Sequence, residues 1–201
     1  MARPNKRKCK QCGEVFQKRT PLQYVCSQRC AIDYAIGKSN AKKEKERRDK
    51  NRKVKDNLKT AGQHRKELQK LINKIAVLID DKQPCICRPH EPTEHFNGGH
   101  YYSVGSVPAM RWNLHNIHKQ SVKSNKYLGG EPLLFREGLI KRYGEDYVAA
   151  LESAREKYKT TKLIIPEMIN LKVKCRKIIG RLKNGESLTR DEVNELLGIY
   201  K

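Results

Sequence analysis

The sequence has few acidic and aromatic residues and no long apolar run. Its 201 residues contain 22 Asp and Glu against 44 Lys and Arg, and aromatic residues make up only 6%. Because hydrophobic residues amount to 37%, the buried core must be small for a chain of this length. No apolar run approaches the roughly 18 residues that a membrane-spanning helix needs. Residues 1–8 are basic but precede no apolar segment, so we expect no secretory signal.

The excess of basic residues gives a formal net charge of +22, which predicts a polyanionic partner. Nucleic acid is the commonest such partner. An anionic membrane surface would require a basic helix with a bulky apolar face, and the most basic stretch has none. We therefore expect an intracellular protein that binds nucleic acid and does not bind a membrane.

Seven cysteines in a chain without a secretory signal argue against a disulfide framework and favour thiolate ligands to a metal. Four of them form two close pairs, Cys9-x2-Cys12 and Cys26-x3-Cys30. Four thiolates fill the tetrahedral coordination of Zn²⁺, so the pattern predicts one closed, structural zinc site. Free buried cysteines or two disulfides are the alternative.

Composition and periodicity divide an α+β chain into four segments. Residues 1–37 are the zinc finger. Residues 38–82 are a long basic helix, of which 38–70 carry 14 Lys and Arg against 5 Asp and Glu, a net charge of +9. Apolar residues recur at helical spacing over residues 68–79. Residues 83–131 form an irregular core with β-like runs at 96–104 and 112–120. Residues 132–201 are helical, with helices expected at 133–143, 145–158 and 166–182 and a capping box at Thr189.

The basic half of the long helix is expected to contact DNA phosphates. A solvated spacer is the alternative, but the charge exceeds what solubility alone requires. The residues expected to make the contacts are Lys42, Lys43, Arg47 and Arg48.

The core segment has the residue types of a nuclease site in a characteristic order. His100 ends the first β-like run, Asn116 lies in the second, and Asn125 follows on an expected helix. This is the order of a ββα-metal (HNH-type) nuclease. Imidazole can take a proton from water near neutral pH, and a divalent ion can offset the charge that develops on a phosphate. The spacing alone is a weak signal, and ordinary core or surface histidines are the alternative.

Together with the cysteine pairs and the basic helix, this segment resembles the NinG or Rap family of phage recombination endonucleases. The resemblance implies metal-dependent endonuclease action on branched DNA, such as Holliday junctions and D-loops. It also implies a location in the cytoplasm of a bacterial host or with its nucleoid. Symmetric junction cleavage would favour a homodimer. The matching residues are Gly99-His100-Tyr101, Pro108, Arg111, Asn113, Asn116-Ile117-His118-Lys119-Gln120 and Asn125.

The resemblance also assigns roles to individual residues. It makes His100 the general base and Asn116 the residue that orients the loop bearing it. A catalytic Mg²⁺ or Mn²⁺ would be held by Asn125, with Asn97 and His118 as further candidate ligands. Additional DNA contacts are expected from Arg111, Lys119 and Lys126.

Two departures from the family pattern weaken these assignments. Many HNH-type sites carry an Asp ligand directly before the catalytic His, where this chain has Gly99. A second zinc knuckle is also incomplete, because one cysteine pair is Cys85-x-Cys87 and the other is replaced by Ser121 and Ser124. Since a serine hydroxyl is a poor zinc ligand, the alternative function is a non-enzymatic zinc-finger protein that binds nucleic acid and keeps a degraded nuclease core.

Overall fold

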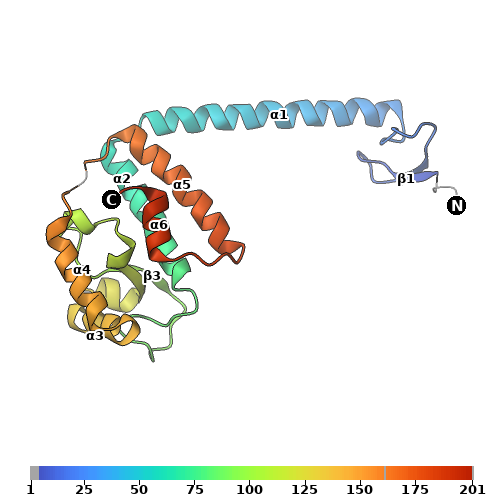
Figure 1. Ribbon diagram of the computed structural model, residues 1–201. Coiled ribbons are helices and arrows are strands. Elements are labelled where there is room, and N and C mark those ends of the chain that lie inside the picture. The colour runs from blue at the N-terminus through green and yellow to red at the C-terminus, as the bar shows by residue number, and fades with distance from the viewer. Residues whose placement is uncertain (1–4, 161, 201) are drawn as a thin grey trace. The chain divides into compact units, whose positions relative to one another are not determined.

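The computed structural model describes residues 5–160 and 162–200, with residues 55–57 described by their backbone only. The chain divides into two compact units, Met1–Lys59 and Thr60–Lys201. Figure 1 labels their helices and the strands β1 and β3. Each unit combines α-helical structure with a two-stranded antiparallel sheet, which confirms the α+β class. None of the helices formed by the described residues is long and apolar enough to cross a membrane.

The first unit is a small hairpin followed by one long helix. Strands β1 (Lys6–Lys8) and β2 (Val15–Gln17) pair antiparallel. Helix α1 (Gln28–Asn57) begins inside the segment expected to be the finger, so Cys30 lies in its first turn. None of the described side chains on α1 is fully buried. Glu44 pairs with Arg47 and Arg48, but exposed ion pairs of this kind contribute little stability. The helix therefore presents a solvated basic surface.

The single helix expected over residues 38–82 is interrupted in the structure. Helix α1 ends at Asn57, and α2 (Ala61–Ile79) begins the second unit. Thr60 caps α2: its Oγ1 accepts from Gln63 N at 3.3 Å, while Gln63 Oε1 accepts from Thr60 N at 2.8 Å. This capping box satisfies backbone N–H groups that a continuous helix would have bonded internally, so a new helix starts there.

A two-stranded sheet occupies the middle of the second unit. Strand β3 (Phe96–His100) pairs with β4 (Ile117–Ser121), and the register sets Asn97 opposite Gln120 and Gly99 opposite His118. Helix α2 lies against one face, because Asn73 Nδ2 donates to Gly98 O at 3.1 Å. A side chain at Gly98 would collide with the α2 backbone, since its Cβ would lie 2.9 Å from Asn73 Cα.

Buried apolar side chains of the second unit form two clusters. The first joins α2 to α5 (Ile165–Lys183) and α6 (Arg190–Leu197). The periodic residues of α2 belong to it, and Leu68, Ile72 and Ile75 are fully buried as predicted. The second cluster joins residues 85–87 to α3 (Pro132–Tyr143) and α4 (Glu145–Lys157). The helical carboxy-terminal segment is thus confirmed, including the capping box between Thr189 and Glu192.

The connections around the sheet are more irregular than expected. The chain leaves β3 after His100 and passes through two short 3₁₀ turns, Pro108–Met110 and Leu114–Asn116, before β4. The second β-like run is therefore shorter than 112–120, because Asn113 caps a turn with its side chain accepting from His115 N. Asn125 lies in a single π-helical turn, Lys123–Tyr127, in place of the expected helix.

A buried carboxylate links three elements of the second unit. Asp80 is the C-cap of α2, and its Oδ2 accepts from Lys119 N of β4 at 2.9 Å and from Arg190 Nη2 of α6 at 2.8 Å. Arg190 Nη2 also donates to His118 Nδ1 at 2.9 Å, and His118 Nε2 donates to His115 O at 3.0 Å. Burial by itself would raise the pKa of Asp80, but His118 and Arg190 hold it well below its ordinary value. Burial, reinforced by Arg190, lowers the pKa of His118 to about 4 despite the neighbouring Asp80.

The second unit should lose stability in mild acid because His118 stays neutral when folded. Unfolded His118 takes up a proton as the pH falls through 6.5, whereas the folded residue resists protonation down to about 4. The free energy of unfolding should therefore fall by about 1–2 kcal/mol between pH 7.5 and pH 5. Asp80 does not contribute in this window, because its stabilisation is lost only below its unfolded pKa near 3.8.

Urea unfolding followed by the fluorescence of Trp112 measures this loss, since the single tryptophan of the chain lies buried in the second unit. The variant His118→Gln should be less stable at pH 7.5 but should lose less between the two pH values. An equal loss in parent and variant would exclude His118 as the titrating group.

Candidate functional site

Four cysteine sulfurs converge in the first unit. The Sγ atoms of Cys9, Cys12, Cys26 and Cys30 all lie within 4.8 Å of one another. Backbone N–H groups of Gln11 and Cys26 each donate to Cys9 Sγ at 3.4 Å. Gly13, directly after the first pair, has a φ of +80°, which glycine adopts without strain. The tight turn after the first pair therefore brings its sulfurs to those of the second.

The thiols of this cluster lose their protons unequally. Although burial would raise the pKa of Cys9, three backbone N–H groups lower it to about 6. Its neighbours Cys30 and Cys12 raise the pKa of Cys26 to about 12. The close sulfurs cannot all be thiolates at once because their negative charges repel. A bound cation offsets that repulsion and allows all four to lose their protons. Four soft donors at this spacing fit a metal ion such as zinc. Among the described residues, no other group of three or more His, Cys, Asp or Glu side chains comes this close together.

The second cysteine pair is built into the protein core. Cys85 Sγ accepts from Ser121 N at 3.2 Å, and Cys87 Sγ accepts from Gln120 Nε2 at 3.0 Å. Burial raises the pKa of Cys87 to about 12, so this residue remains a thiol. Ser121 Oγ donates to Ser124 Oγ at 3.0 Å. The two serines, at the positions where the resemblance implies two further ligands, thus bond to each other.

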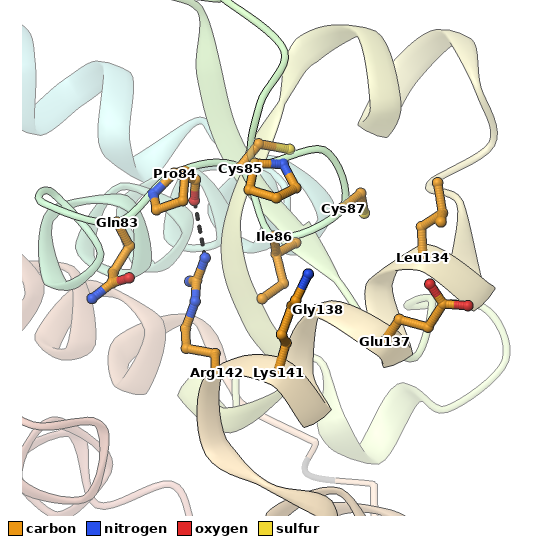
Figure 2. Close-up of a pocket in the computed structure, with 11 residues that line it drawn as sticks. Gln83, Pro84, Cys85, Ile86, Cys87, Leu134, Glu137, Gly138, Lys141 and Arg142 are labelled. Atoms are coloured by element: carbon orange, nitrogen blue, oxygen red, sulfur yellow. Dashed lines mark hydrogen bonds between the residues drawn. The ribbon is translucent and has the colours of Figure 1, made fainter.

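A pocket of about 240 Å³ lies beside this pair, between residues 83–89 and α3 (Figure 2). Helix α3 approaches closely at Gly138, where an added Cβ would lie 1.9 Å from Ile86 O. Arg142 Nη2 donates to Pro84 O at 3.0 Å, the bond drawn dashed in Figure 2. These contacts hold the segment that carries Cys85 and Cys87 rigidly against the helix.

His100 contacts two groups through the same ring nitrogen. Its Nε2 lies 3.1 Å from Arg111 O and 3.2 Å from Gln69 Nε2 of α2. Burial lowers the pKa of His100, and the charge of Arg111 acts in the same direction, although the hydrogen bond to the Arg111 carbonyl opposes it. The imidazole is therefore neutral near pH 7.

The loop that supplies the Arg111 carbonyl is held from two sides. Buried Asn116 accepts from Tyr102 N at 2.7 Å and donates to Tyr102 O at 3.0 Å and Met110 O at 3.2 Å. Near the carboxyl end of the chain, the Tyr200 hydroxyl accepts from Trp112 N at 3.0 Å and donates to Ala109 O at 2.9 Å. The Trp112 N–H and the Arg111 carbonyl belong to one peptide group, so Tyr200 fixes the plane of the carbonyl that faces His100.

These contacts fit the orienting role expected of Asn116, which stays a prediction. Sequence reasoning did not identify Tyr200 or Gln69. Neither residue belongs to a local sequence motif, because each is brought to the site only by the tertiary fold.

The cationic side chain of Arg111 lies next to His100. Arg111 Nε donates to Gln69 Oε1 at 3.0 Å. Burial lowers the pKa of Arg111, and the nearby charge of Arg65 adds to the effect. A guanidinium that is partly desolvated and next to a second cation favours a bound anion. The arrangement can accept a phosphate close to the imidazole.

The expected ligands of a catalytic ion do not form one donor set. Asn125 Nδ2 donates to Asn97 Oδ1 at 2.6 Å, so the two amides bond to each other. Asn97 and His100 are three residues apart on β3 and therefore point to opposite faces of the sheet. His118 is fully buried with both ring nitrogens bonded, which corrects its assignment as a ligand. The residues present do not fit a divalent ion beside His100.

Gly99, in the place of the missing Asp, has no room for a side chain. Its Cβ would lie 1.9 Å from Gln120 Oε1. Gln120 is itself fully buried, so a carboxylate at position 99 would require the glutamine to move.

The residues expected to contact DNA differ in exposure. Lys42, Lys43, Arg47 and Arg48 on α1 and Lys126 are exposed. Lys119 is buried: its Nζ donates to Asp81 O at 2.8 Å and lies 4.4 Å from the centroid of the Phe96 ring. The expected phosphate contact at Lys119 is therefore corrected to a structural one.

Comparison with known proteins places these features in a family. The family model described as "Bacteriophage Lambda NinG protein" matches residues 1–186. Protein ninG of Escherichia phage lambda is 30% identical over 203 residues, covering 93% of this chain and 98% of the relative. The protein of the same name from Enterobacteria phage H19B is 29% identical with the same coverage. That of Salmonella phage P22 is 30% identical, covering 80% of this chain and 87% of the relative. No solved structure matches the chain. With nearly its whole length matched, the chain belongs to the NinG family of bacteriophage proteins.

Proposed function

We propose that this protein is a DNA endonuclease that hydrolyses phosphodiester bonds at branched recombination intermediates. The observation that carries the proposal is the setting of His100. When Nε2 bears the proton and donates to Arg111 O, Nδ1 is the basic nitrogen. Among the described residues, none bonds to Nδ1. A neutral imidazole with one nitrogen anchored and the other free is what a general base for water requires.

Arg111 and Arg65 supply the complementary part of the reaction. A guanidinium beside the base can hold the scissile phosphate and offset the charge that builds up on its oxygens in the transition state. The loop contacts of Asn116 and Tyr200 keep base and cation at a fixed separation, as efficient catalysis requires.

The choice of substrate rests on charge and on the family resemblance. The exposed cations of α1 and the basic residues around the cysteine cluster favour DNA. Preference for Holliday junctions and D-loops, and action as a homodimer, come from the resemblance alone. The resemblance also implies Mg²⁺ or Mn²⁺, but no step is assigned to an ion because its expected ligands are not assembled.

The alternative is a non-enzymatic zinc-finger protein that binds branched DNA. It is favoured by the separation of Asn125 from His100 and by the mutual bonding of Ser121 and Ser124. The two functions differ in one measurable respect: only the first cuts DNA.

Zinc should be bound at about one ion per chain by Cys9, Cys12, Cys26 and Cys30. Cys26→Ser should release the metal and unfold the finger, because structural zinc supplies much of the folding free energy of such small modules. Cys85→Ser is the matched control and should leave the metal content unchanged, since Cys85 bonds to a backbone N–H. Elemental analysis decides the matter, and two zinc ions per chain would contradict the single site.

DNA binding should weaken steeply with salt, with a slope of about 0.9 per neutralised phosphate. Replacing Lys42, Lys43, Arg47 and Arg48 by Ala should lower the slope by roughly two to four, the lower figure applying if Glu44 already neutralises the two arginines. Fluorescence anisotropy with a labelled four-way junction measures the affinity at each salt concentration and so gives the slope. As a control, four exposed cations of the second unit, Lys157, Lys159, Arg176 and Lys177, are replaced together. Equal slopes in both variants would show a general effect of net charge.

His100→Ala should reduce cleavage of a four-way junction by about 10²–10⁴-fold, the usual contribution of a positioned base. Affinity for the junction should change little, because His100 is neutral and binding is mostly electrostatic. His95→Ala is the control, since His95 is exposed on the preceding loop. Reactions contain Mg²⁺, Mn²⁺ or chelator, and a linear duplex serves as the comparison substrate. If the parent binds junctions but never cuts them with either ion, the non-enzymatic function replaces the nuclease.

A further inference from the structure

Gln69 lies where the base and the cation of the proposed site meet. Its Oε1 accepts from Arg111 Nε at 3.0 Å, and its Nε2 donates to Asn73 Oδ1 at 2.7 Å. These two bonds fix the orientation of the amide, because a guanidinium can only donate and Oε1 can only accept. The second N–H of Gln69 Nε2 is then available to His100 Nε2, 3.2 Å away.

His100 Nε2 therefore faces a donor and an acceptor at once. In one neutral tautomer Nε2–H donates to Arg111 O, and in the other the bare Nε2 accepts from Gln69. The imidazolium, like the Nε2–H tautomer, satisfies only the carbonyl and points its Nε2–H at the N–H of Gln69. Gln69 therefore stabilises the neutral tautomer with a bare Nε2, which lowers the proton affinity of the ring. The charged groups nearby act in the same sense, because Arg111 disfavours the imidazolium and Arg65 of α2 adds positive charge next to Arg111.

We propose that Gln69 is a positioning residue that keeps His100 neutral and holds Arg111 beside it. One side chain of α2 thereby sets both the proton affinity of the base and the location of the phosphate-binding cation. The catalytic consequence rests on the proposed function, whereas the effect on His100 protonation does not.

The test is an NMR titration of the His100 ring in the full-length, zinc-loaded protein. Gln69→Glu places a carboxylate next to Nε2 and should raise the pKa of His100 by about one pH unit or more. Gln69→Met has a similar shape but no donor, so the ring nitrogen shifts should move toward the Nε2–H tautomer alone. Gln83→Glu is the matched control. Gln83 is exposed in the same unit, so this substitution introduces the same negative charge away from His100.

Trp112 fluorescence checks that each variant is folded. If Gln69→Glu unfolds, the His100 ring nitrogen shifts in the uncharged Gln69→Met variant test the proposal. Ring shifts and titration equal to those of the parent in folded variants would overturn the proposal. So would a shift of the same size in Gln83→Glu.

Junction cleavage provides the second measurement. The acidic limb of the pH–rate profile should move to higher pH in Gln69→Glu. Gln69→Met should cut about 10-fold more slowly because Arg111 loses the hydrogen bond that holds it beside His100. If no variant and no parent cuts DNA but the titrations shift as expected, the role of Gln69 stands and the nuclease function fails. If the parent cuts and neither the titration nor the profile moves, the role of Gln69 fails alone.

Discussion

The second unit depends on the buried carboxylate of Asp80. It joins the end of α2 to the backbone of β4 and to Arg190 of α6. Truncating Asp80 would leave Arg190 as a buried, unpaired charge, which typically costs 3–5 kcal/mol. Gln69 and Asn73 project from the same α2 onto His100 and Gly98, so α2 contacts both strands of the sheet, β4 through Asp80 and β3 directly.

The candidate site is assembled by backbone groups as much as by side chains. The carbonyl that anchors His100 is one end of a peptide group whose other end bonds to Tyr200, and Asn116 pairs with the backbone of Tyr102 and Met110. The Arg111 carbonyl cannot rotate without breaking the bond between Trp112 N and Tyr200, which lies after α6. Precise placement of a base on an irregular loop normally requires this kind of outer support, so the loop is rigid despite having little regular structure.

Sequence reasoning succeeded where the signal is local. The cysteine spacings, the apolar periodicity of α2 and the capping box at Thr189 each lie within one turn or one helix, and the structure has them as predicted. Sequence reasoning failed where the role of a residue depends on whether the fold buries it. His118 and Lys119 have the right residue types for a ligand and a phosphate contact, but the fold places both inside. The break at Thr60 was visible as a capping box, yet the continuous charge pattern on both sides concealed it.

The two departures from the family pattern are unequal as arguments against hydrolysis. Gly99 and Gln120 both belong to the stretch that resembles the family, and a side chain at position 99 would fit only if the buried Gln120 moved. The packing of this core therefore accounts for glycine at position 99. Gln120 also bonds to Cys87 and to Gly130 O, so it would hold this arrangement whether or not a metal once occupied the second knuckle. Only the serine pair is left as a specific loss, and its hydroxyls bond to each other. Losing a structural metal at that position would lower stability without removing the base, so the knuckle and the chemistry are separable.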